Sequence, residues 1–378
     1  MTDLLISALV SILGVTLAAH LLSALLAGWR YRQRPAAPAD ETKLPYISLV
    51  RPVCGLDSFD RETLGASFRQ DYPRYEILFC APSETDASVP LVRQLIAENP
   101  QVEATLLFGE TPISGNPKLN NLHKGYREAR GEWLAMTDSN LLLPPDYLRT
   151  LITTWRRDTG LVSSPPAGIR PGNFWGAVEC AFLNSSQGRW QLAADSVGLG
   201  FAQGKTLFWR RDILEAGGGL PALGRNLAED VAATKLVRAQ GKRVRLTPRL
   251  FAQPIGTRHA RAVWDRQLRW SKVRRDGFAL IFCAEIAQGP LLPLAATLGL
   301  VATGAAPMGA LPALVALWYG SEIALARVAG WPAGLRDLAA MMVRDALLPA
   351  LWIATWTGRG FTWRGTDMAP AEAAGAAE

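Results

Sequence analysis

Long uncharged apolar runs stand at the two ends of this chain, and a water-compatible region lies between them. In residues 4–27 the one titratable side chain is that of His20. At about 1.5 Å per residue, a helix of this length crosses the roughly 30 Å hydrocarbon core of a bilayer. Arg30, Arg32 and Arg34 follow the run, whereas a cleavable signal peptide carries its basic residues first. The pattern predicts a membrane anchor whose C-terminal side is cytoplasmic, with a buried helix of a soluble domain as the alternative.

The C-terminal apolar region begins near Ile286, and no charged residue occurs between there and Gly320. That length exceeds one helix, and the prolines and glycines of residues 304–312 indicate a break. A further apolar run contains Arg344 and Asp345. Charges are costly in a membrane, so we expect this pair to face protein or a cavity, or to lie in a re-entrant segment. The predicted membrane segments are 290–306, 309–326 and 338–356.

The region from residue 46 to about residue 285 alternates short apolar runs with stretches of helical periodicity. Such β–α alternation predicts an α/β fold, in which a mainly parallel sheet is covered by helices on both faces. In open sheets of this kind, ligands bind beyond the carboxyl ends of the strands. Strands are predicted at 47–50, 75–81, 102–108 and 132–137, and helices at 61–69, 89–98 and 118–130.

Composition narrows the classes of protein. Hydrophobic residues make up 49% of the 378 residues and charged residues 19%, which excludes intrinsic disorder. The four cysteines are widely spaced and form no Cys-x-x-Cys pair, so neither a disulfide scaffold nor a zinc motif is indicated. Forty lysines and arginines against 33 acidic residues give a net charge of +7. This excess suits an anionic ligand or membrane surface, and without a recognisable nucleic-acid-binding module no nucleic acid is expected.

Three acidic residues stand next to predicted elements. Asp138 directly follows the strand at 132–137, where a carboxylate is well placed to hold Mg²⁺ or Mn²⁺ together with substrate phosphates. A turn or capping aspartate is the alternative. Glu229 and Asp230 precede a helical stretch, where acids are often only partners of the helix dipole. The residues alone leave both alternatives open.

A basic stretch, residues 266–275, follows later in the chain. Arg266 and Arg269 are three residues apart, so they share a helix face from which they can clamp a diphosphate. A basic amphipathic helix that rests on anionic lipid is the alternative, and both can hold.

Six short motifs occur along the chain in a distinctive order. They are Arg51-Pro52-Val53-Cys54-Gly55, Gln70-Asp71-Tyr72-Pro73-Arg74-Tyr75-Glu76, Gly115-Asn116-Pro117-Lys118-Leu119-Asn120-Asn121-Leu122, Asp138-Ser139, Ala228-Glu229-Asp230 and Arg266-x-x-Arg269-Trp270. In this order the chain resembles the ceramide glucosyltransferases, a membrane-bound branch of the inverting GT-A glycosyltransferases. The resemblance covers about residues 46–277 and extends to the apolar segments at both ends.

This resemblance implies a GT-A domain, a UDP-sugar donor and a divalent metal, Mg²⁺ or Mn²⁺. It implies that Asp86 contacts the nucleotide base, that Asp138 binds the metal and the diphosphate, and that Asp230 is the general base. The remaining residues implied to bind substrate are Lys118 and Asn121 near the donor nucleotide, and Arg266, Arg269 and Trp270 near the diphosphate and the acceptor.

Two positions depart from the family pattern. The metal motif reads Asp138-Ser139-Asn140, so Asn140 offers only a neutral ligand where the family has a second aspartate. Gln187 lies in a stretch where the animal enzymes carry a histidine, and an amide cannot transfer a proton in its place.

The function that the resemblance implies is transfer of a sugar, most readily glucose, to the hydroxyl of ceramide. The reaction would invert the anomeric carbon and give a β-glycosphingolipid at the cytoplasmic face of a bacterial inner membrane. One alternative is another membrane lipid, such as a hopanoid, with UDP-N-acetylglucosamine or another UDP-sugar; a second is a non-catalytic protein that binds nucleotide sugar or lipid. The expected organisation is an anchor at 1–29, a linker at 30–45, the GT-A domain at 46–260, an amphipathic interface helix at 261–285, membrane segments at 286–358 and a tail at 359–378 that is disordered at its end.

Overall fold

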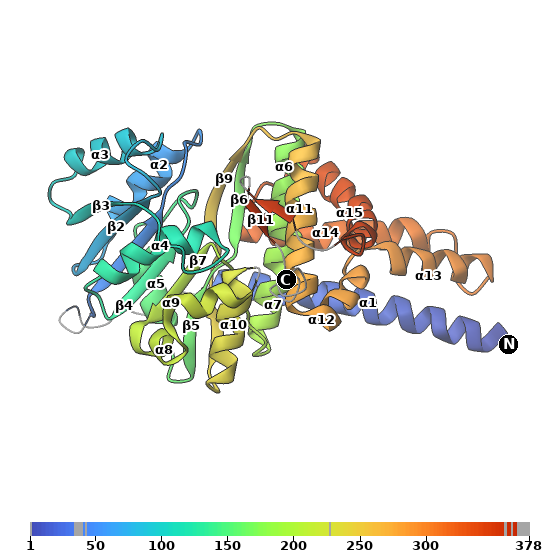
Figure 1. Cartoon of the computed structure of the whole chain (residues 1–378). Helices are drawn as coiled ribbons and strands as arrows, with labels where there is room; N and C mark the ends of the chain where they lie inside the picture. Colours follow the sequence, from blue (N-terminus) through green and yellow to red (C-terminus); the bar gives the residue numbers. More distant parts are fainter. Residues whose placement is uncertain are drawn as a thin grey trace. The chain divides into compact units, whose positions relative to one another are not determined.

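The computed structural model describes residues 2–33, 41, 44–226, 228–358, 361–363 and 366–368. The chain divides into two compact units, whose elements are labelled in Figure 1. The sheet unit comprises Gln33–Ala167, Ala194–Pro254 and Arg359–Glu378, and the helical unit comprises Met1–Arg32, Gly168–Ala193 and Ile255–Gly358. Most of the predicted linker at 30–45 and of the predicted tail at 359–378 lies outside the described residues.

A seven-stranded sheet forms the centre of the sheet unit, in the order β3-β2-β1-β4-β7-β5-β8. The first four of these strands run parallel, as β5 does with β8, whereas β7 is antiparallel to both β4 and β5. The predicted α/β sheet is therefore confirmed, and the antiparallel strand is a feature that the alternation did not predict. The strands are β1 (Ile47–Pro52), β2 (Tyr75–Ala81), β3 (Ala104–Phe108), β4 (Trp133–Thr137), β5 (Thr159–Ser163), β7 (Thr206–Arg210) and β8 (Arg243–Leu246).

Helices cover both faces of this sheet (Figure 1). Adjacent residues of a strand point to opposite faces, so Leu49 packs in one core with Val92 of α3, and Val50 packs in the other with Leu119 of α4. Strands that are buried on both faces have continuous apolar sequences, and this property made them visible in the sequence. The helices are α2 (Asp60–Gly65), α3 (Val89–Glu98), α4 (Pro117–Glu128), α5 (Tyr147–Thr154), α8 (Arg211–Ala216), α9 (Gly219–Ala222) and α10 (Glu229–Ala239), with 3₁₀ turns η2 (Ala66–Arg69) and η4 (Leu223–Arg225).

Five predicted elements of the sheet unit differ from the structure at their ends. The strand predicted at 47–50 extends to Pro52, and the strand predicted at 132–137 begins at Trp133. The helix predicted at 61–69 is divided into α2 and the 3₁₀ turn η2. The strand predicted at 102–108 begins at Ala104, because Val102 N donates to Asn99 O in a turn. The helix predicted at 118–130 begins at Pro117, directly after its capping residue Asn116, and ends at Glu128.

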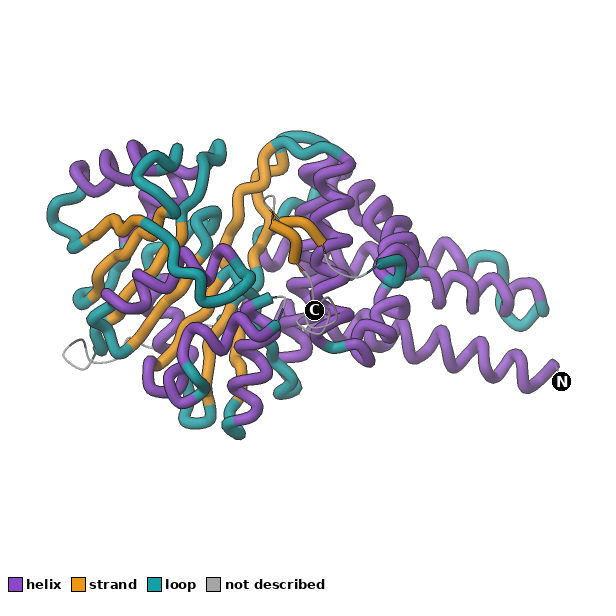
Figure 2. Tube along the Cα trace, viewed as in Figure 1, coloured by secondary structure: helices purple, strands orange, loops and turns teal. Residues whose placement is uncertain are grey.

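The helical unit is built mainly from helices (Figure 2). Two strands, β6 (Pro166–Pro171) and β9 (Phe251–Gly256), pair with each other where the chain passes from one unit into the other, and β10 (Phe361–Trp363) pairs with β11 (Thr366–Met368) in the sheet unit. The helices are α1 (Thr2–Arg32), α6 (Phe174–Ala181), the π-helix η3 (Phe182–Gly188), α7 (Arg189–Ser196), α11 (Ala260–Gly277), α12 (Ala279–Ala284), the 3₁₀ turn η5 (Glu285–Gln288), α13 (Leu291–Ala302), α14 (Ala310–Ala329) and α15 (Leu335–Thr355).

Among the residues that the structure describes, three helices are long and apolar enough to cross a membrane: α1 over Asp3–Arg32, α14 and α15. They match the predicted anchor and the segments predicted at 309–326 and 338–356. The segment predicted at 290–306 is not a single long helix: α13 has 12 residues and is bent by 48° against the preceding helix Ala279–Gln288 at Gly289-Pro290. That bent pair has the composition of a broken span or a re-entrant loop.

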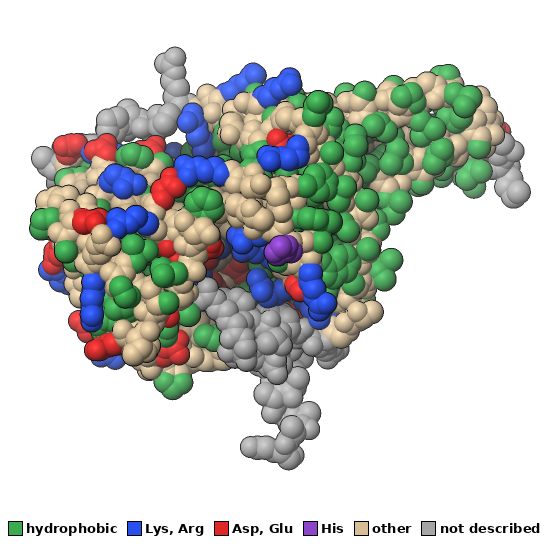
Figure 3. Space-filling model, turned by 90° about the horizontal axis from the view of Figure 1, so that it is seen from above, with side chains coloured by type: hydrophobic (Ala, Val, Ile, Leu, Met, Phe, Trp, Pro, Cys, Tyr) green, Lys and Arg blue, Asp and Glu red, His purple; other side chains and the backbone are tan. Residues whose placement is uncertain are grey.

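Hydrophobic side chains gather on the outer surface of the helical unit, as Figure 3 shows. In α1 the side chains of Leu4 and Val15 are at least 70% exposed, which is unusual for large apolar residues of a soluble protein. By contrast, Arg344 and Asp345 of α15 are buried and contact protein groups, as predicted for charges in an apolar helix. The surface and the buried charges both suit a helix bundle in lipid.

Candidate active site

The carboxylate of Asp138 lies at the carboxyl end of β4, between two lysine side chains. Lys118 Nζ is 2.6 Å from Asp138 Oδ1, and Lys205 Nζ is 2.8 Å from Oδ2. β7 runs antiparallel to β4, with Thr206 opposite Thr137. Lys205, which directly precedes β7, therefore lies at the same edge of the sheet as Asp138. Burial alone would raise the pKa of Asp138, but the two ammonium groups outweigh burial and hold that pKa well below its usual range.

The position of Lys118 follows from the start of α4. Asn116 caps this helix by accepting a hydrogen bond from Lys118 N at 2.9 Å. Lys118 Nζ reaches Glu229 Oε1 at 2.7 Å and donates to Gly204 O at 2.6 Å. Burial lowers the pKa of Lys118, but Asp138 and Glu229 raise it above the usual value, so the side chain remains an ammonium.

Asp230 is the second residue of α10 and adjoins Glu229. Its Oδ2 accepts a hydrogen bond from Gly204 N at 3.0 Å, and its Oδ1 accepts one from Val231 N at 2.8 Å. Gly204 therefore contacts both Asp230 and Lys118, so the two acids of α10 and Asp138 surround one short segment of chain. Burial, together with the negative charge of Glu229, raises the pKa of Asp230 to about 6. A carboxylate with such a pKa can accept a proton efficiently near neutral pH.

Asp86 comes after β2 in the chain. In the sheet, β1 lies between β2 and β4 and runs parallel to both, so Asp86 and Asp138 follow strand ends at the same edge. Its two carboxylate oxygens accept hydrogen bonds from Gly55 N at 3.0 and 3.1 Å, and Oδ1 also accepts from the backbone N and the hydroxyl of Ser88. Gly55 has a φ of 68°, a conformation that favours glycine. Burial raises the pKa of Asp86, but the hydrogen bonds from Ser88 and Gly55 outweigh it and lower the pKa. Asp86 is thus ionised and joins the loops after β1 and β2.

Asn121 of α4 is buried beneath those loops. Its Nδ2 donates to Cys80 O at 2.8 Å and to Val53 O at 3.3 Å, and its Oδ1 accepts from Lys124 Nζ at 2.5 Å. The amide is engaged with the ends of β1 and β2. Asn121 therefore holds these strand ends in place, beside the position where donor binding is predicted for it.

Arg51 is a fully buried arginine that the sequence placed in a motif but not in the site. Its Nη2 donates to the carbonyl oxygens of Asp138 (2.7 Å), Ser139 (3.0 Å) and Leu141 (3.0 Å), and Nη1 donates to Ser67 Oγ at 2.7 Å. These bonds fix the turn that carries Asp138. The signal that could have identified Arg51 is a charged residue inside the apolar strand Ile47–Pro52, since buried charges need dedicated partners.

Lys205 is a second site residue that the sequence did not indicate. In the sequence it is one lysine before an apolar strand, and its partners Asp138 and Asn140 lie about 65 residues away along the chain. Glu229 was singled out only as a helix-dipole acid, although it forms an ion pair with Lys118. No local pattern reports either pairing, because both depend on the antiparallel placement of β7 and on the position of α10.

The motif Arg266-x-x-Arg269-Trp270 lies on α11 in the helical unit. Arg266 Nη1 forms an ion pair with the buried Glu179 Oε1 of α6 at 2.7 Å, and the Arg266 guanidinium lies 5.4 Å from the centre of the Trp270 ring. Trp270 packs against a small core formed by Cys180 of α6, Leu183 of η3 and Ile255 of β9. The structure thus brings Arg266 and Trp270 together, and Arg269 follows one turn after Arg266 on the same helix.

Oxygen atoms of Asp138 and Asn140 converge on a single cation. Lys205 Nζ donates to Asp138 Oδ2 at 2.8 Å and to Asn140 Oδ1 at 2.9 Å. Within the described part of the chain, no group of three or more His, Cys, Asp or Glu side chains is arranged to hold an ion by itself. Mg²⁺ and Mn²⁺ prefer oxygen ligands and often take most of them from water and substrate phosphates. The residues present therefore fit a divalent ion that binds together with a diphosphate.

Comparison with known proteins places the chain in a family. The family model described as glycosyl transferase family 21 matches residues 5–373. This chain belongs to glycosyl transferase family 21. The family 21 match confirms the resemblance drawn from the ordered motifs.

Two of the similar proteins are from Caenorhabditis elegans. Ceramide glucosyltransferase 1 is 30% identical over 247 residues, which are 65% of this chain and 53% of that protein. Ceramide glucosyltransferase 3 is 28% identical over 237 residues, 62% of this chain and 52% of that protein. The family 21 chain thus spans about half the length of the curated relatives it matches.

Among solved structures, the mannosyltransferase PcManGT from Pyrobaculum calidifontis, in complex with GDP-Man and Mn²⁺, aligns with 92% of this chain and 99% of its own. The TM-score is 0.55 and the sequence identity 22%. This likeness shows that the family 21 chain shares the glycosyltransferase fold that the motifs implied.

Proposed function

We propose that this family 21 protein transfers glucose from UDP-glucose to a hydroxyl of ceramide, with inversion of the anomeric carbon. The observation that carries the proposal is the cluster at the carboxyl edge of the sheet, where Lys118 and Lys205 flank Asp138 and lie beside Asp230. This cluster combines the two groups that sugar transfer needs: positive charge for a leaving diphosphate and a base for the attacking hydroxyl. Ceramide is favoured as the acceptor because the similar curated proteins are named ceramide glucosyltransferases.

The leaving diphosphate gains negative charge as the glycosidic bond breaks. Lys118 and Lys205 are held as ammonium groups at one edge of the sheet and can neutralise that charge without further reorganisation. A divalent ion, when bound, would be held by Asp138 and Asn140 and would add to the same neutralisation. We propose that Asp86 lies beside the nucleotide base, as the family pattern implies.

Asp230 is the proposed base. Its raised pKa makes the carboxylate a stronger proton acceptor than an exposed aspartate, and its hydrogen bonds from Gly204 and Val231 fix its orientation. One base and one displacement turn an α-linked donor into a β-glycoside without a covalent intermediate. The backbone contact from Gly204 also ties the base to the segment that carries Lys205.

A lipid acceptor would explain why the protein has apolar helices long enough to cross a membrane. We propose that α1, α14 and α15 lie in a bacterial inner membrane, that the sheet unit faces the cytoplasm, and that α11 rests at the interface with Arg266, Arg269 and Trp270 near the acceptor. Aromatic and basic side chains of this kind anchor helices at a membrane surface.

The rate of transfer is expected to fall in acid as Asp230 takes up a proton. A base with a pKa of about 6 is ionised above that pH, so kcat/KM should be level near pH 7.5 and lose about tenfold per pH unit well below pH 6. In the control variant Glu229→Gln, loss of the neighbouring charge lowers the pKa of Asp230, so the acid limb should move to lower pH. A profile that stays level down to pH 5 would contradict the role of Asp230.

Chelation with EDTA is expected to lower transfer at least about tenfold, and Mn²⁺ or Mg²⁺ should restore it. The unfolding temperature should not change, because Lys118 and Lys205 already neutralise Asp138 in the metal-free protein. The matched variant Asn140→Asp adds a second anionic ligand and should need less metal for half-maximal rate. Full activity in EDTA would argue that the lysines suffice.

The proposal is tested by mass spectrometry of the lipids formed when membranes containing this protein receive ceramide and one UDP-sugar at a time. A hexosylceramide formed from UDP-glucose, and degraded by a β-specific glucosidase, supports the proposal. Glycosylation of a hopanoid or of another lipid in place of ceramide would refute the assigned acceptor, and product from UDP-N-acetylglucosamine alone would refute the assigned donor.

A further inference from the structure

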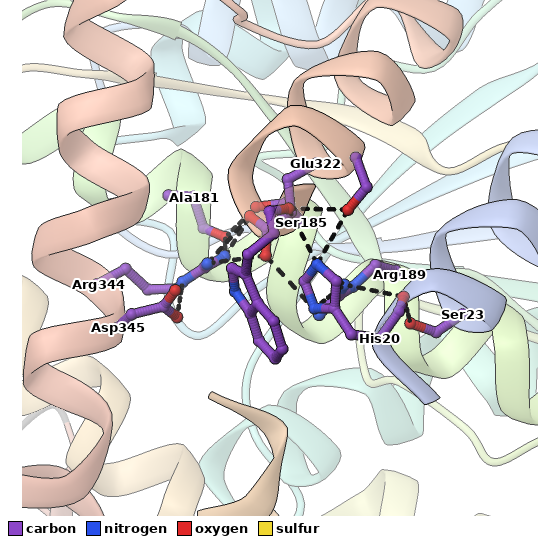
Figure 4. Close-up of polar contacts among 10 residues, drawn as sticks. His20, Ser23, Ala181, Ser185, Arg189, Glu322, Arg344 and Asp345 are labelled. Carbon is purple, nitrogen blue, oxygen red and sulfur yellow. Dashed lines mark hydrogen bonds and ion pairs between the residues drawn. The ribbon is translucent and has the colours of Figure 1, made fainter. Parts of the chain in front are cut away.

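Five ionisable side chains meet inside the helical unit, in the network shown in Figure 4. They come from four helices and are at most 7% exposed. Three of those helices, α1, α14 and α15, are the ones long and apolar enough to cross a membrane. Ionisable groups within membrane-spanning helices cost free energy unless each is paired, and they usually have a functional role. The five residues, called the buried network below, are His20, Arg189, Glu322, Arg344 and Asp345.

Glu322 and Arg344 form the centre of the buried network. Arg344 Nη2 donates to both carboxylate oxygens of Glu322 at 3.0 Å, and Arg344 Nε donates to Asp345 Oδ1 at 2.8 Å. Arg189 Nη2 lies 3.8 Å from Glu322 Oε1. Two guanidinium groups therefore face two carboxylates, and their charges balance without a bound ion.

The same bonds fix the state of His20. Arg189 Nη1 lies 2.8 Å from His20 Nδ1, and a guanidinium can only donate, so Nδ1 is the acceptor and carries no proton. The proton is on Nε2, which faces Trp318 O at 3.1 Å and Ser321 Oγ at 3.0 Å. The imidazole is thus neutral and links α1 to α14.

The buried network holds a widened helical segment. The residues Phe182–Gly188 form a π-helix, η3, which is rare and is found most often at functional sites. On one side, Arg344 Nη1 donates to Ser185 Oγ in the middle of η3 at 2.8 Å and to Ala181 O just before it at 3.3 Å. On another side, Asn184 exchanges hydrogen bonds of 2.7 and 2.9 Å with the backbone N and O of Gly168. η3 is therefore fixed by groups from outside its own helix.

η3 in turn contacts the helix that carries the Arg266-x-x-Arg269-Trp270 motif. Gln187 Nε2 donates to Gln267 Oε1 at 2.7 Å, and Gln267 is 1% exposed between the motif residues of α11. Arg266 pairs with Glu179 of α6, the helix that runs directly into η3. α11 is thus held at two neighbouring residues by one continuous helical rod, α6 with η3.

We propose that Glu322 and Arg344 are positioning residues for the acceptor side of the reaction: they fix η3, and through Gln187 and Gln267 they fix the motif on α11. The proposal rests on the proposed function for its kinetic consequence, but the mechanical link itself does not. Donor binding in the sheet unit is expected to be independent of this link, whereas use of the lipid acceptor depends on it.

The test replaces the central pair by apolar residues of similar size, Glu322→Leu with Arg344→Met. Such a replacement of a buried ion pair often leaves a fold intact. Hydrogen exchange measured by mass spectrometry should rise at least about fivefold in 182–188 and in 265–270. The kcat/KM for ceramide should fall at least about tenfold with KM for UDP-glucose unchanged, since small misplacements of a reacting group are costly.

Two further variants keep the test decisive if the double variant fails to fold. Ser185→Ala removes one hydroxyl from the contact with Arg344 and keeps every charge, and should show the same changes on a smaller scale. The matched control Thr297→Val removes a buried hydroxyl of α13 that donates to Pro293 O within the same helix, and should show neither change. Unchanged exchange in 182–188 and 265–270 in Ser185→Ala, or in a folded double variant, would overturn the proposal.

A mutant cycle separates positioning from general destabilisation. Gln187→Leu cuts the link between η3 and α11 but leaves the buried network intact. If the network acts through that link, the triple variant that combines Gln187→Leu with Glu322→Leu and Arg344→Met should have a kcat/KM for the acceptor no lower than that of whichever component variant is more impaired. Multiplied losses would overturn the proposal. If the wild-type protein glycosylates no ceramide, the proposed function fails, and the exchange measurements still decide whether the network fixes α11.

Discussion

Replacing Asp230 by asparagine is expected to lower the rate of sugar transfer by about 10²- to 10⁴-fold, the range that general-base catalysis contributes. The new amide would retain a hydrogen-bond acceptor for Gly204 N but could not take the proton of the acceptor hydroxyl. The dissociation constant of the UDP-sugar should change by less than about threefold. Transfer kinetics with radiolabelled donor and calorimetric donor binding on the detergent-purified protein measure the two quantities.

Asp212 offers a matched control for that experiment. It lies in the first turn of α8 as Asp230 does in α10, and its Oδ1 accepts the next backbone N–H at 2.8 Å, as does Oδ1 of Asp230. The variant Asp212→Asn should therefore transfer sugar at the wild-type rate. If Asp230→Asn retained more than about a tenth of the activity, Asp230 would not be the base. If the wild-type protein bound donor but neither transferred nor hydrolysed it, the binding-protein alternative would be favoured.

Replacing Lys118 by methionine is expected to lower the free energy of unfolding by about 3 kcal/mol and to abolish transfer. The substitution leaves Asp138 and Glu229 without their shared cation, and breaking a buried ion pair from one side costs about 3–5 kcal/mol. The lower end applies because the Asp138 side chain is 23% exposed. In a protein of this size the midpoint of thermal unfolding should drop by several degrees.

The control is Lys235→Met on α10, since this lysine is exposed and no ion pair or hydrogen bond is described for it. Its unfolding free energy should change by less than about 0.5 kcal/mol. A Lys118→Met protein as stable as the control would show that the carboxylates do not need the ammonium in the folded state. Loss of stability without loss of donor binding would separate the structural role of Lys118 from the role proposed for it at the diphosphate.

The two carboxylates of α10 show which features a residue pattern predicts and which it does not. The helix after residue 229 and the position of two acids in its first turn were evident from the sequence. Their different roles were not, because Glu229 is paired with Lys118 and Asp230 is hydrogen-bonded to Gly204, and both partners lie elsewhere in the chain. The role proposed for Asp230 came from the family resemblance. The raised pKa that suits that role arises from burial and from Glu229, which only the fold brings to bear.

The sequence by itself determined where the apolar helices lie, that an α/β sheet stands between them, and that Asp86 and Asp138 follow strands that end at one edge. These features depend on the burial of each residue, which hydrophobic periodicity records locally. Tertiary structure alone decided that β7 runs antiparallel and brings Lys205 to Asp138, that α13 is short and bent against the helix before it, and that His20 and Arg344 share one buried network. Such contacts join residues up to about 300 positions apart, and no local pattern records which distant group will meet a given one.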